Sequence, residues 1–535
     1  MISEIVDVNI SIEDTAVSQA GFGVGLVVGS SDRLSSKVQE FASAAAAAEV
    51  YEDGDPELKM IQQYFGQEIQ PTRVIAAQRD ADQAEKIKIT IPTLANAVDY
   101  SVTISIDGAS GVLNTFTSDG DATREEIVDG LVALIEADFP DTLTLTDNGD
   151  DFDIASAVAG DGLSITLSVN LAQQTVTAHR NLSTELAEIL QLNNEWYCLL
   201  SASHLDKDIK RGAAFVQANA KVYIPSSQNA DIISPEAHVG TLDFDADFVT
   251  SNTIDLTIDG IPVDQTTFSS DQATTIAALA SNIQAHPAVA TATVTDTNQI
   301  TVTAEENDQL MVFTAIVVAA GASQASGAFT TTVDPTTDLG AELEALGYDR
   351  TALMYSGTAD SVYPEAAWAG LLLPENPGSI TWFAKTLTGV AADSLTATQK
   401  AKALGNNVNT YTSVGGVSIM QNGTMASGRF IDIRRGVDWV KSRIETLVYS
   451  RIVNAKKIPY TNAGVAIIEN EIRFALNEAV NNDVLAADPA PTVTAPNVLD
   501  VASADRANRL LPNVSFTGRL AGAIHEVDIN GTVSV

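Results

Sequence analysis

The chain has 535 residues, more than a single hydrophobic core normally supports, so about three or four domains of ~100–200 residues are expected. Its 69 acidic and 29 basic residues give a net charge of −40, which would repel a phosphate backbone or an anionic membrane unless a basic face were segregated. A hydrophobic content of 45% is that of a folded protein and excludes general disorder.

The sequence favours folding in a cytoplasm. A single cysteine, Cys198, cannot form an internal disulfide, and its apolar neighbours predict a buried, inert thiol. The first residues lack the basic start of a signal peptide. The longest apolar stretches, near 20–29 and 311–322, are shorter than the ~20 residues that span a bilayer, so no membrane insertion is expected.

The chain begins with an alternating segment typical of a β-strand. Val6, Val8, Ile10 and Ile12 are separated by polar residues, and we assign residues 1–20 to an N-terminal arm. A strand with an open edge can pair with another chain, although pairing inside the monomer is an alternative that the pattern leaves open.

Glycines at positions 21, 23 and 25 precede a short apolar strand expected at 23–30. A dinucleotide-binding fingerprint requires a strand before its glycines and a helix after them, whereas here the strand follows. The glycines are therefore expected to serve a turn or close packing, and not a nucleotide.

The segments 21–84, 179–239 and 336–430 alternate strands with helices, which predicts a discontinuous α/β core domain. The expected strands are at 23–30, 72–77, 196–200, 221–225, 351–355 and 380–384. The expected helices are at 56–66, 184–192, 206–218, 340–346, 364–373 and 396–404. Such alternation is typical of a mixed sheet flanked by helices.

Two stretches inside this core domain resemble each other. Val102–Gly108 is echoed by Ile254–Gly260, and each is followed by a phenylalanine, an Ala-Thr pair and a helical stretch in the same order. We therefore expect two copies of one inserted α+β module, module 1 (residues 85–178) and module 2 (residues 240–335). A chance likeness between two Thr/Asp-rich β segments is the alternative.

Both modules are strongly acidic. Module 1 has 16 acidic and 3 basic residues, and module 2 has 12 acidic residues and no Lys or Arg, which gives net charges of −13 and −12. Together they supply −25 of the total of −40. Charge of this density favours full solvation, so both modules are expected to project away from the core domain.

The last hundred residues predict a separate α+β domain, which we place at 431–522. Helices are expected at 438–452, with Asp438 as the cap, and at 462–480, because each shows an apolar face at helical spacing. A proline-rich stretch then leads to a strand expected at 513–520.

A C-terminal arm, residues 523–535, closes the chain. A strand is expected from 524 onward because apolar and polar residues alternate again. The positions expected to pair with another subunit are Val527, Ile529, Val533 and Val535.

Basic residues gather in the C-terminal domain. Nine of the 29 Lys and Arg residues lie between Arg429 and Arg473, together with five acidic residues. Charge complementarity steers association and fixes register, so this span predicts a face that docks on an acidic partner; a solvated helix face is the alternative. The expected contacts are Lys441, Arg443, Arg451, Lys456 and Lys457.

No catalytic, cofactor-binding or metal-binding residues are expected. The five histidines lack metal-ligand spacing, and the sequence has no Cys-x-x-Cys pair and no Walker-type phosphate loop. Acidic clusters at 52–55, 150–153 and 243–247 lack the loop that calcium requires.

These features together resemble contractile phage tail sheath proteins. The opening 6–12 segment before Gly21–Gly29, the Arg-rich helix 438–452, the helix 464–480 and the terminal strands are similar to that family. The acidic modules lie outside the part that is similar.

The resemblance implies subunits that stack helically as homo-hexameric rings around a tail tube protein, with the C-terminal domain innermost and both arms adding strands to a neighbour's sheet. It implies contacts with baseplate and tail terminator proteins, and no direct nucleic-acid contact. It also implies assembly in the host bacterial cytoplasm, a place in the virion tail sheath, and contraction that drives the tube through the host envelope without nucleotide hydrolysis.

Two other readings remain at this level. An acidic repeat-containing surface or adhesin protein would account for the Thr/Asp-rich modules but not for the α/β core. An α/β enzyme is favoured only by the strand–helix alternation, and a fold alone does not indicate an activity.

Overall fold

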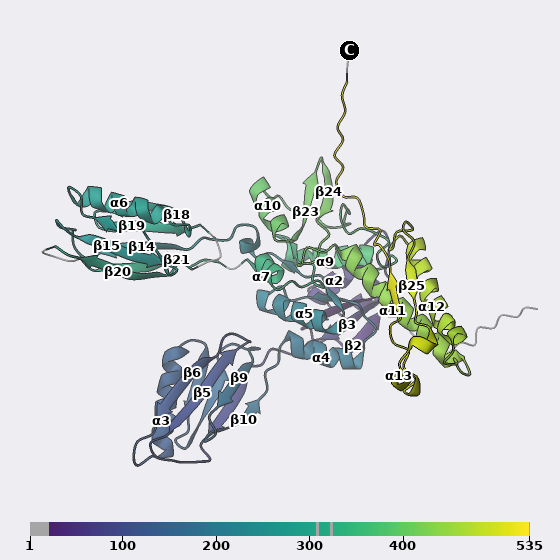
Figure 1. Ribbon diagram of the computed structural model, residues 1–535, viewed down its shortest axis with the longest axis horizontal. Helices are drawn as coiled ribbons and strands as arrows, with labels where there is room; N and C mark the ends of the chain where they lie inside the picture. The colour runs from purple at the N-terminus through teal and green to yellow at the C-terminus, as the bar shows by residue number, and fades with distance from the viewer. Residues whose placement is uncertain (1–20, 306–309, 322–324, 337, 534–535) are drawn as a thin grey trace, which may run out of the picture.

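The computed structural model describes residues 21–305, 310–321, 325–336 and 338–533. A central core domain carries two lobes on one side and a C-terminal domain on the other (Figure 1). The chain is therefore a mixed α/β protein of several domains, as the sequence predicts.

The core domain is organised around a five-stranded sheet of order β12-β11-β1-β3-β2. The central strand β1 (Gly25–Gly29) runs parallel to β3 (Val74–Gln78) and β11 (Cys198–Ser201). The outer strands are β12 (Val222–Tyr223), which is parallel to β11, and β2 (Val38–Phe41), which is antiparallel to β3. Every residue of β1 is buried, as expected for a parallel strand that is covered on both faces.

A second sheet of order β13-β22-β23-β24 continues the core domain. Its strands are β13 (Ser226–Ser227), β22 (Met354–Tyr355), β23 (Asn409–Val414) and β24 (Val417–Gln421). The first three are parallel and β24 returns antiparallel to β23.

Helices cover both faces of the core sheets. Leu58 and Tyr64 of α2 pack with Trp368 of α9 on one face, while Leu186 of α4 and Ile209 of α5 belong to a second buried cluster with residues of α7. The core helices are α1 (Ala44–Ala48), α2 (Pro56–Phe65), α4 (Leu182–Leu192), α5 (Asp206–Asn219), α7 (Leu339–Ala345), α8 (Ala359–Val362), α9 (Pro364–Leu372) and α10 (Ala397–Gly405).

The glycines before β1 serve close packing. A Cβ on Gly21 would lie 2.4 Å from the carbonyl oxygen of Glu195, and a Cβ on Gly25 would lie 3.1 Å from the ring of Tyr64. The Gly25 N–H donates to the Tyr64 hydroxyl at 3.0 Å. The packing interpretation is confirmed, as is the burial of Cys198, whose pKa is raised by burial.

The strand expected at 380–384 is wrong. These residues form a loop that carries the buried Trp382, whose ring lies 5.1 Å from that of Trp368, edge to face. Its aromatic and β-branched residues fill the core from a loop and make no strand ladder.

The residues assigned to module 1 form two sheets and one helix. The sheets have the orders β10-β4-β8-β7 and β6-β5-β9. In chain order the elements are β4 (Lys86–Thr90), β5 (Asp99–Ile106), β6 (Val112–Thr117), α3 (Arg124–Asp138), β7 (Leu143–Asp147), β8 (Asp151–Ser156), β9 (Leu163–Leu167) and β10 (Ala172–Thr177).

The residues assigned to module 2 repeat this topology. The sheet orders are β18-β19-β14-β21 and β16-β15-β17, with β20 also on β15. The elements are β14 (Val239–Phe244), β15 (Thr253–Ile258), β16 (Ile261–Pro262), β17 (Thr266–Thr267), α6 (Gln272–Gln284), β18 (Val289–Asp296), β19 (Gln299–Ala304), β20 (Phe313–Ala319) and β21 (Gly327–Val333). Matched in chain order, β14, β15, α6, β18, β19, β20 and β21 take the places of β4, β5, α3, β7, β8, β9 and β10.

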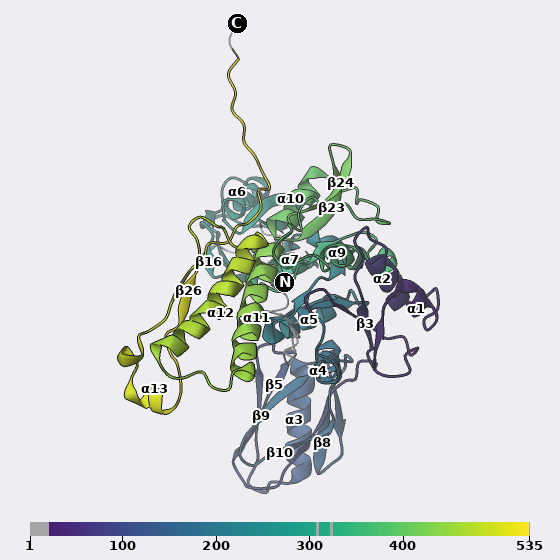
Figure 2. The ribbon, with the colours of Figure 1, turned by 90° about the vertical axis from the view of Figure 1, so that its right-hand side faces the viewer.

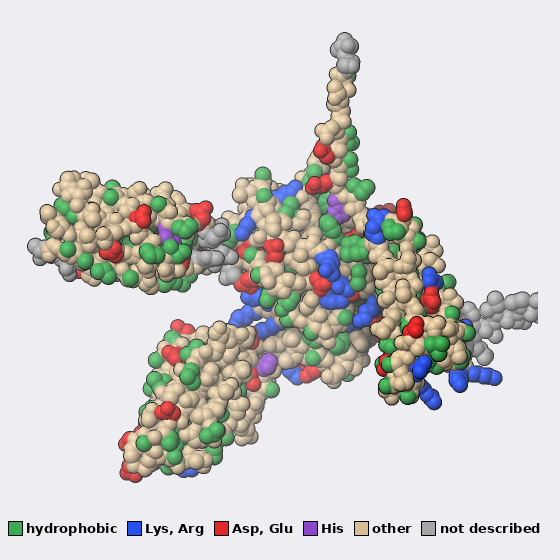
Figure 3. Space-filling model, in the orientation of Figure 1, with side chains coloured by type: hydrophobic (Ala, Val, Ile, Leu, Met, Phe, Trp, Pro, Cys, Tyr) green, Lys and Arg blue, Asp and Glu red, His purple; other side chains and the backbone are tan. Residues whose placement is uncertain are grey.

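Each module has its own hydrophobic cluster, and neither cluster includes a core-domain residue. Both modules extend from the core domain as separate lobes (Figure 1). On the face drawn in Figure 3, module 2 shows acidic side chains and no basic ones.

The C-terminal domain consists of two long helices and a small sheet. Helices α11 (Ile431–Asn454) and α12 (Asn462–Asn481) lie side by side (Figure 2) and share a buried cluster that includes Val440, Ile472 and Leu476. The smaller elements are β25 (Thr492–Thr494), the 3-10 turn η2 (Val498–Asp500), α13 (Ser503–Ala507) and β26 (Ser515–Thr517).

Two expectations for this region need correction. The strand expected at 513–520 is limited to Ser515–Thr517, since the residues around it make turns and irregular backbone. Asp438 does not cap a helix, because α11 begins at Ile431 and Asp438 lies inside it.

Candidate assembly surface

Helix α11 joins the C-terminal domain to the core domain through a buried arginine. Arg435 is fully buried, and its guanidinium donates to the carbonyl oxygens of Leu372 at 2.9 Å, Leu373 at 3.1 Å and Phe22 at 3.3 Å. It also lies 5.4 Å from the centre of the Trp382 ring. These contacts fix the first half of α11 against the core domain.

Asp438 makes the second connection. Its two carboxylate oxygens accept hydrogen bonds from the two terminal nitrogens of Arg350, each at 2.8 Å. The Tyr197 hydroxyl donates to it at 2.8 Å and Arg434 donates at 2.5 Å. The predicted cap is therefore a buried ion-pair partner, because the first two turns of α11 are packed into the core domain.

Three of the five predicted basic contacts have carboxylate partners inside the C-terminal domain. Arg443 donates to both oxygens of Glu478 on α12, at 2.7 and 3.0 Å. Arg451 pairs with Glu471 at 3.5 Å, and Lys441 pairs with Glu445 at 3.9 Å. Each of these three charges is at least partly neutralised before any partner arrives.

Lys456 and Lys457 stay exposed on the loop between α11 and α12, and neither makes an ion pair within the part of the chain that the structure describes. Both lysines line a cavity of about 350 Å³, and Arg509 lines the same cavity. Its apolar lining includes Ile452, Ile458, Val465, Ile468 and Leu511. The sequence analysis did not single out Arg509, because it lies far from Lys456 and Lys457 in the chain and comes next to them only in the fold.

A second, apolar cavity of about 430 Å³ lies between α11 and the residues around β26. Its apolar side chains are Val437, Val440, Ile444, Leu485, Phe516 and Leu520, and Lys441 and Glu445 stand at its border. Phe516 is 45% exposed although it is large and apolar. This face can bury apolar side chains of another molecule.

The small sheet of this domain contains the two strands β25 and β26, which pair antiparallel from Thr492–Thr517 to Thr494–Ser515. Among the described residues no third strand joins either edge. A strand with an open edge presents unpaired N–H and C=O groups that another strand can bind.

The C-terminal arm leaves the subunit at His525. The imidazole of His525 stacks on the ring of Phe383 with ring centres 4.4 Å apart and meets the ring of Phe430 edge to face at 4.7 Å. It also shares a hydrogen bond with the Thr381 hydroxyl at 2.9 Å. Beyond His525 the described residues form neither helix nor strand, and the arm rises away from the body (Figure 2).

The predicted pairing positions that can be located are exposed. The exposed fractions are 72% for Val527, 84% for Ile529 and 97% for Val533. The other predicted pairing positions, Val6, Val8, Ile10, Ile12 and Val535, lie outside the described residues.

A serine–histidine–carboxylate cluster lies in the core domain. His204 lies 2.7 Å from Asp360 and 3.0 Å from Glu365, and the buried Ser226 hydroxyl donates to Glu365 at 2.6 Å. The Ser226 hydroxyl also lies 3.4 Å from Nε2 of His204, and Ser226 and Glu365 are fully buried, so these contacts stabilise the core domain. Burial alone would lower the pKa of His204, but Glu365 and Asp360 outweigh it and raise that pKa.

Within the described ranges, no group of His, Cys, Asp and Glu side chains is arranged to hold a metal ion. Over the same ranges, none of the helices combines the length and the apolar character that crossing a bilayer requires.

The C-terminal domain matches a known family. Residues 431–489, from the first residue of α11 to beyond α12, match the family described as E217 tail sheath protein gp31-like, C-terminal domain. The search of curated proteins found no match to the chain.

Three solved structures are similar to nearly the whole chain at low identity. The first is a cryo-EM structure of the anti-feeding prophage (AFP) baseplate, 6-fold symmetrised, with 10% identity and a TM-score of 0.45 over 99% of this chain and 98% of that chain. The second is a cryo-EM structure of the AFP helical sheath in the contracted state, with 10% identity and a TM-score of 0.44 over 98% of each chain. The third is the sheath tail protein Lin1278 from Listeria innocua, with 8% identity and a TM-score of 0.35 over 96% of this chain and 97% of that chain.

The sequence match covers the helix pair that links the core domain to the exposed cavities and open sheet described above. Tail sheath proteins are structural proteins and not enzymes. Over residues 431–489, the chain is therefore similar to the C-terminal domain of tail sheath proteins.

Proposed function

We propose that the chain is the sheath subunit of a contractile tail, which polymerises as hexameric rings stacked helically around a tail tube protein. The polymer contacts baseplate and tail terminator proteins at its ends. Its contraction drives the tube through the host envelope, and the particle is assembled in the host bacterial cytoplasm. We assign no nucleic-acid contact and no cofactor to it.

One observation carries this proposal: an unpaired arm and an open sheet occur in the same subunit. The arm beyond His525 exposes Val527, Ile529 and Val533, while β25 and β26 have no third strand among the described residues. Strand addition would satisfy the backbone groups of both and bury the apolar side chains of the arm. A subunit that offers both halves of such a contact can associate head to tail, because each arm engages the next copy, and such association builds closed rings or helical polymers.

The cavity between α11 and β26 lies next to this sheet and supports the same arrangement. Phe516 lines the cavity and also pairs with Val493 across the sheet, so a strand added at the β26 edge would run beside apolar surface. The N-terminal arm, with Val6, Val8, Ile10 and Ile12, is proposed to add a second strand from another neighbour.

The tube-facing surface is proposed to be the loop between α11 and α12. Lys456 and Lys457 have no ion pair within the described ranges, and Arg509 adds a third positive charge at the same cavity. Lys441, Arg443 and Arg451 contribute more weakly, since each has a carboxylate neighbour. Exposed ion pairs stabilise by about 0–1 kcal/mol each, so such contacts can be released during contraction.

Electron microscopy of the purified full chain by negative stain tests the proposal. Hollow striated cylinders are expected from the full chain, and dispersed particles from a chain that ends at Gly522. Asp528→Asn, which changes a polar position between the pairing positions and keeps the length of the arm, is the matched control and should still form cylinders. Compact oligomers would favour an enzyme, flat arrays or fibres would favour a surface protein, and either result would overturn the proposal.

A further inference from the structure

The two modules carry the same aspartate at the same turn. Asp107 of module 1 and Asp259 of module 2 each stand in an Ile-Asp-Gly sequence. The Asp107 N–H donates to the Gly162 carbonyl at 3.0 Å, and its carboxylate accepts the Gly162 N–H at 2.9 Å. Asp259 makes the same two bonds with Val312, at 2.9 and 2.8 Å. The internal role of this aspartate is therefore common to both modules.

The second carboxylate oxygen distinguishes the two copies. In module 1, Oδ2 of Asp107 accepts a hydrogen bond at 2.6 Å from Arg211 on α5 of the core domain. Arg211 also donates to Asp161 at 2.9 Å and to the Gly160 carbonyl at 3.0 Å. Burial alone would raise the pKa of Asp107, but the Gly162 N–H and Arg211 hold it below its usual value.

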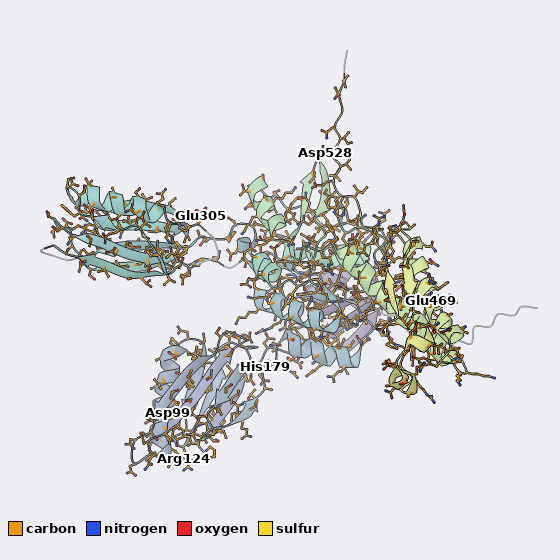
Figure 4. The ribbon with its side chains drawn as sticks, viewed as in Figure 1. Asp99, Arg124, His179, Glu305, Glu469 and Asp528 are labelled. Carbon is orange, nitrogen blue, oxygen red and sulfur yellow. The ribbon has the colours of Figure 1, made fainter. Side chains whose placement is uncertain are left out.

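Lys207, one turn earlier on α5, strengthens the same contact. Its ammonium group donates to both oxygens of Asp161, at 3.0 and 2.9 Å. The side chains of Arg211 and Asp161 are only 12% and 7% exposed, so their attraction is screened less by salt than that of a surface pair. Arg211, Lys207, Asp107 and Asp161 thus meet where module 1 joins the core domain, the region in which Figure 4 labels His179.

Module 2 has no counterpart to this junction. It contains no Lys or Arg, and within the described residues no ion pair joins it to the core domain. The neighbouring cation on α5, Lys210, pairs at 2.8 Å with Glu342 of α7, which follows module 2 in the chain. The Glu236 N–H donates to the Thr336 hydroxyl at 2.7 Å, so the two connecting segments are tied to each other.

A local attraction is needed to dock an acidic module here. Module 1 carries −13, and the chain outside both modules carries −15, which is −40 less the −25 of the modules. Two bodies of the same sign repel each other at long range, so a fixed orientation requires specific opposite charges at the contact.

We propose that Arg211 and Lys207 of α5 form an electrostatic clamp with Asp107 and Asp161, and that this clamp locks module 1 in one orientation on the core domain. Module 2, whose Asp259 makes no such ion pair among the described residues, is tethered by its two connecting segments and samples a range of orientations. The duplicated modules therefore differ in mobility although they share one topology.

Pairs of spin labels on the full chain test this difference. Cys198 is buried, so labels attach to introduced cysteines only. Asp150→Cys and Thr297→Cys place labels on equivalent turns at β7–β8 and β18–β19, and Ala401→Cys on α10 is the common reference. The distribution of distances between the labels at 150 and 401 (the 150–401 distribution) is expected to be narrow. The distribution between the labels at 297 and 401 (the 297–401 distribution) is expected to be at least about twofold broader.

Removal of the clamp should make module 1 behave like module 2. Arg211→Gln and, separately, the surface change Lys207→Glu are each expected to broaden the 150–401 distribution by about twofold or more and to leave 297–401 unchanged. Lys210→Gln is the matched control on the same helix and should change neither. Two results would overturn the proposal: a 150–401 distribution that stays narrow in both clamp variants, or a 297–401 distribution as narrow as 150–401 in the unmodified chain.

Discussion

Arg350 and Asp438 form a two-point ion pair in which both terminal guanidinium nitrogens lie 2.8 Å from a carboxylate oxygen. The two side chains are 11% and 9% exposed, and they join the core domain to the first helix of the C-terminal domain. Asp438 also pairs with Arg434, whereas Arg350 has Asp438 as its partner. Removal of Asp438 therefore leaves Arg350 buried without its counter-charge, and such a loss costs about 3–5 kcal/mol.

Asp438→Leu is therefore expected to lower the free energy of unfolding by about 3–5 kcal/mol, as measured by urea denaturation. Arg473→Met is the control, because its pair with Glu469 is half exposed and should contribute about 1 kcal/mol or less. Equal losses in the two variants would contradict the role of the buried pair.

The stacking of His525 on Phe383 predicts that the root of the arm sets its direction. His525→Ala should leave the free energy of unfolding nearly unchanged and reduce the length of the cylinders, because the arm then leaves the subunit at no fixed angle. His525→Phe keeps a ring between Phe383 and Phe430 and should restore the length. Failure of the phenylalanine to restore it would count against stacking as the cause.

The carboxylates around His204 predict a loss of stability toward alkaline pH. Its folded-state pKa is raised above the ordinary 6.5, so its stabilising effect is complete below pH 6.5 and is lost as the pH rises through the folded-state value. His204→Gln should remove this dependence. Thermal unfolding of both proteins, followed across this range, gives the measurement.

Lys221 contributes a pH dependence of the opposite sign, since burial lowers its pKa to about 8 and stability then rises with pH above that value. The contribution of Lys221 to the pH dependence of stability is the same in both proteins. The difference between the pH profiles of the unmodified chain and of His204→Gln therefore reports on His204. Parallel pH profiles for the two would refute the prediction.

Lys456 and Lys457 of the α11–α12 loop, which make no ion pair with any described residue, predict a salt-dependent contact. The double change Lys456→Glu and Lys457→Glu should weaken assembly on a tail tube, and the defect should grow as the salt concentration falls because repulsion is then less screened. Lys441→Glu, whose charge already has Glu445 nearby, should have a smaller effect. Sedimentation of sheath with and without tube measures both, and an equal effect of the two changes would argue against this loop as the contact.

Sequence periodicity predicts elements well where their apolar faces are regular. The helix expected at 462–480 is α12, Asn462–Asn481, because Ile472, Ala475 and Leu476 recur at helical spacing and pack on α11. The strands and helices that alternate before module 1 are found within a few residues of their expected bounds.

The first turns of α11 could not be predicted, because their buried side chains are charged. Asp432, Arg435 and Asp438 interrupt the apolar pattern, and the groups that satisfy Arg435 and Asp438 lie in distant segments that meet only in the fold. The sequence shows where cations gather, but it does not show that Arg443 is held by Glu478 on the next helix while Lys456 is left without such a partner among the described residues.

Helix α11 runs without a break from the core domain into the C-terminal domain, and its 24 residues make a rod about 36 Å long. Arg435 and Asp438 fix the first turns of α11 to the core domain. A rotation of the core domain by ~10° would therefore displace the C-terminal end of α11 by ~6 Å. The subunit thus transmits a rotation of the core domain rigidly to the α11–α12 loop. In the proposed sheath, the terminal arms would then have to take up any change in spacing between neighbouring copies.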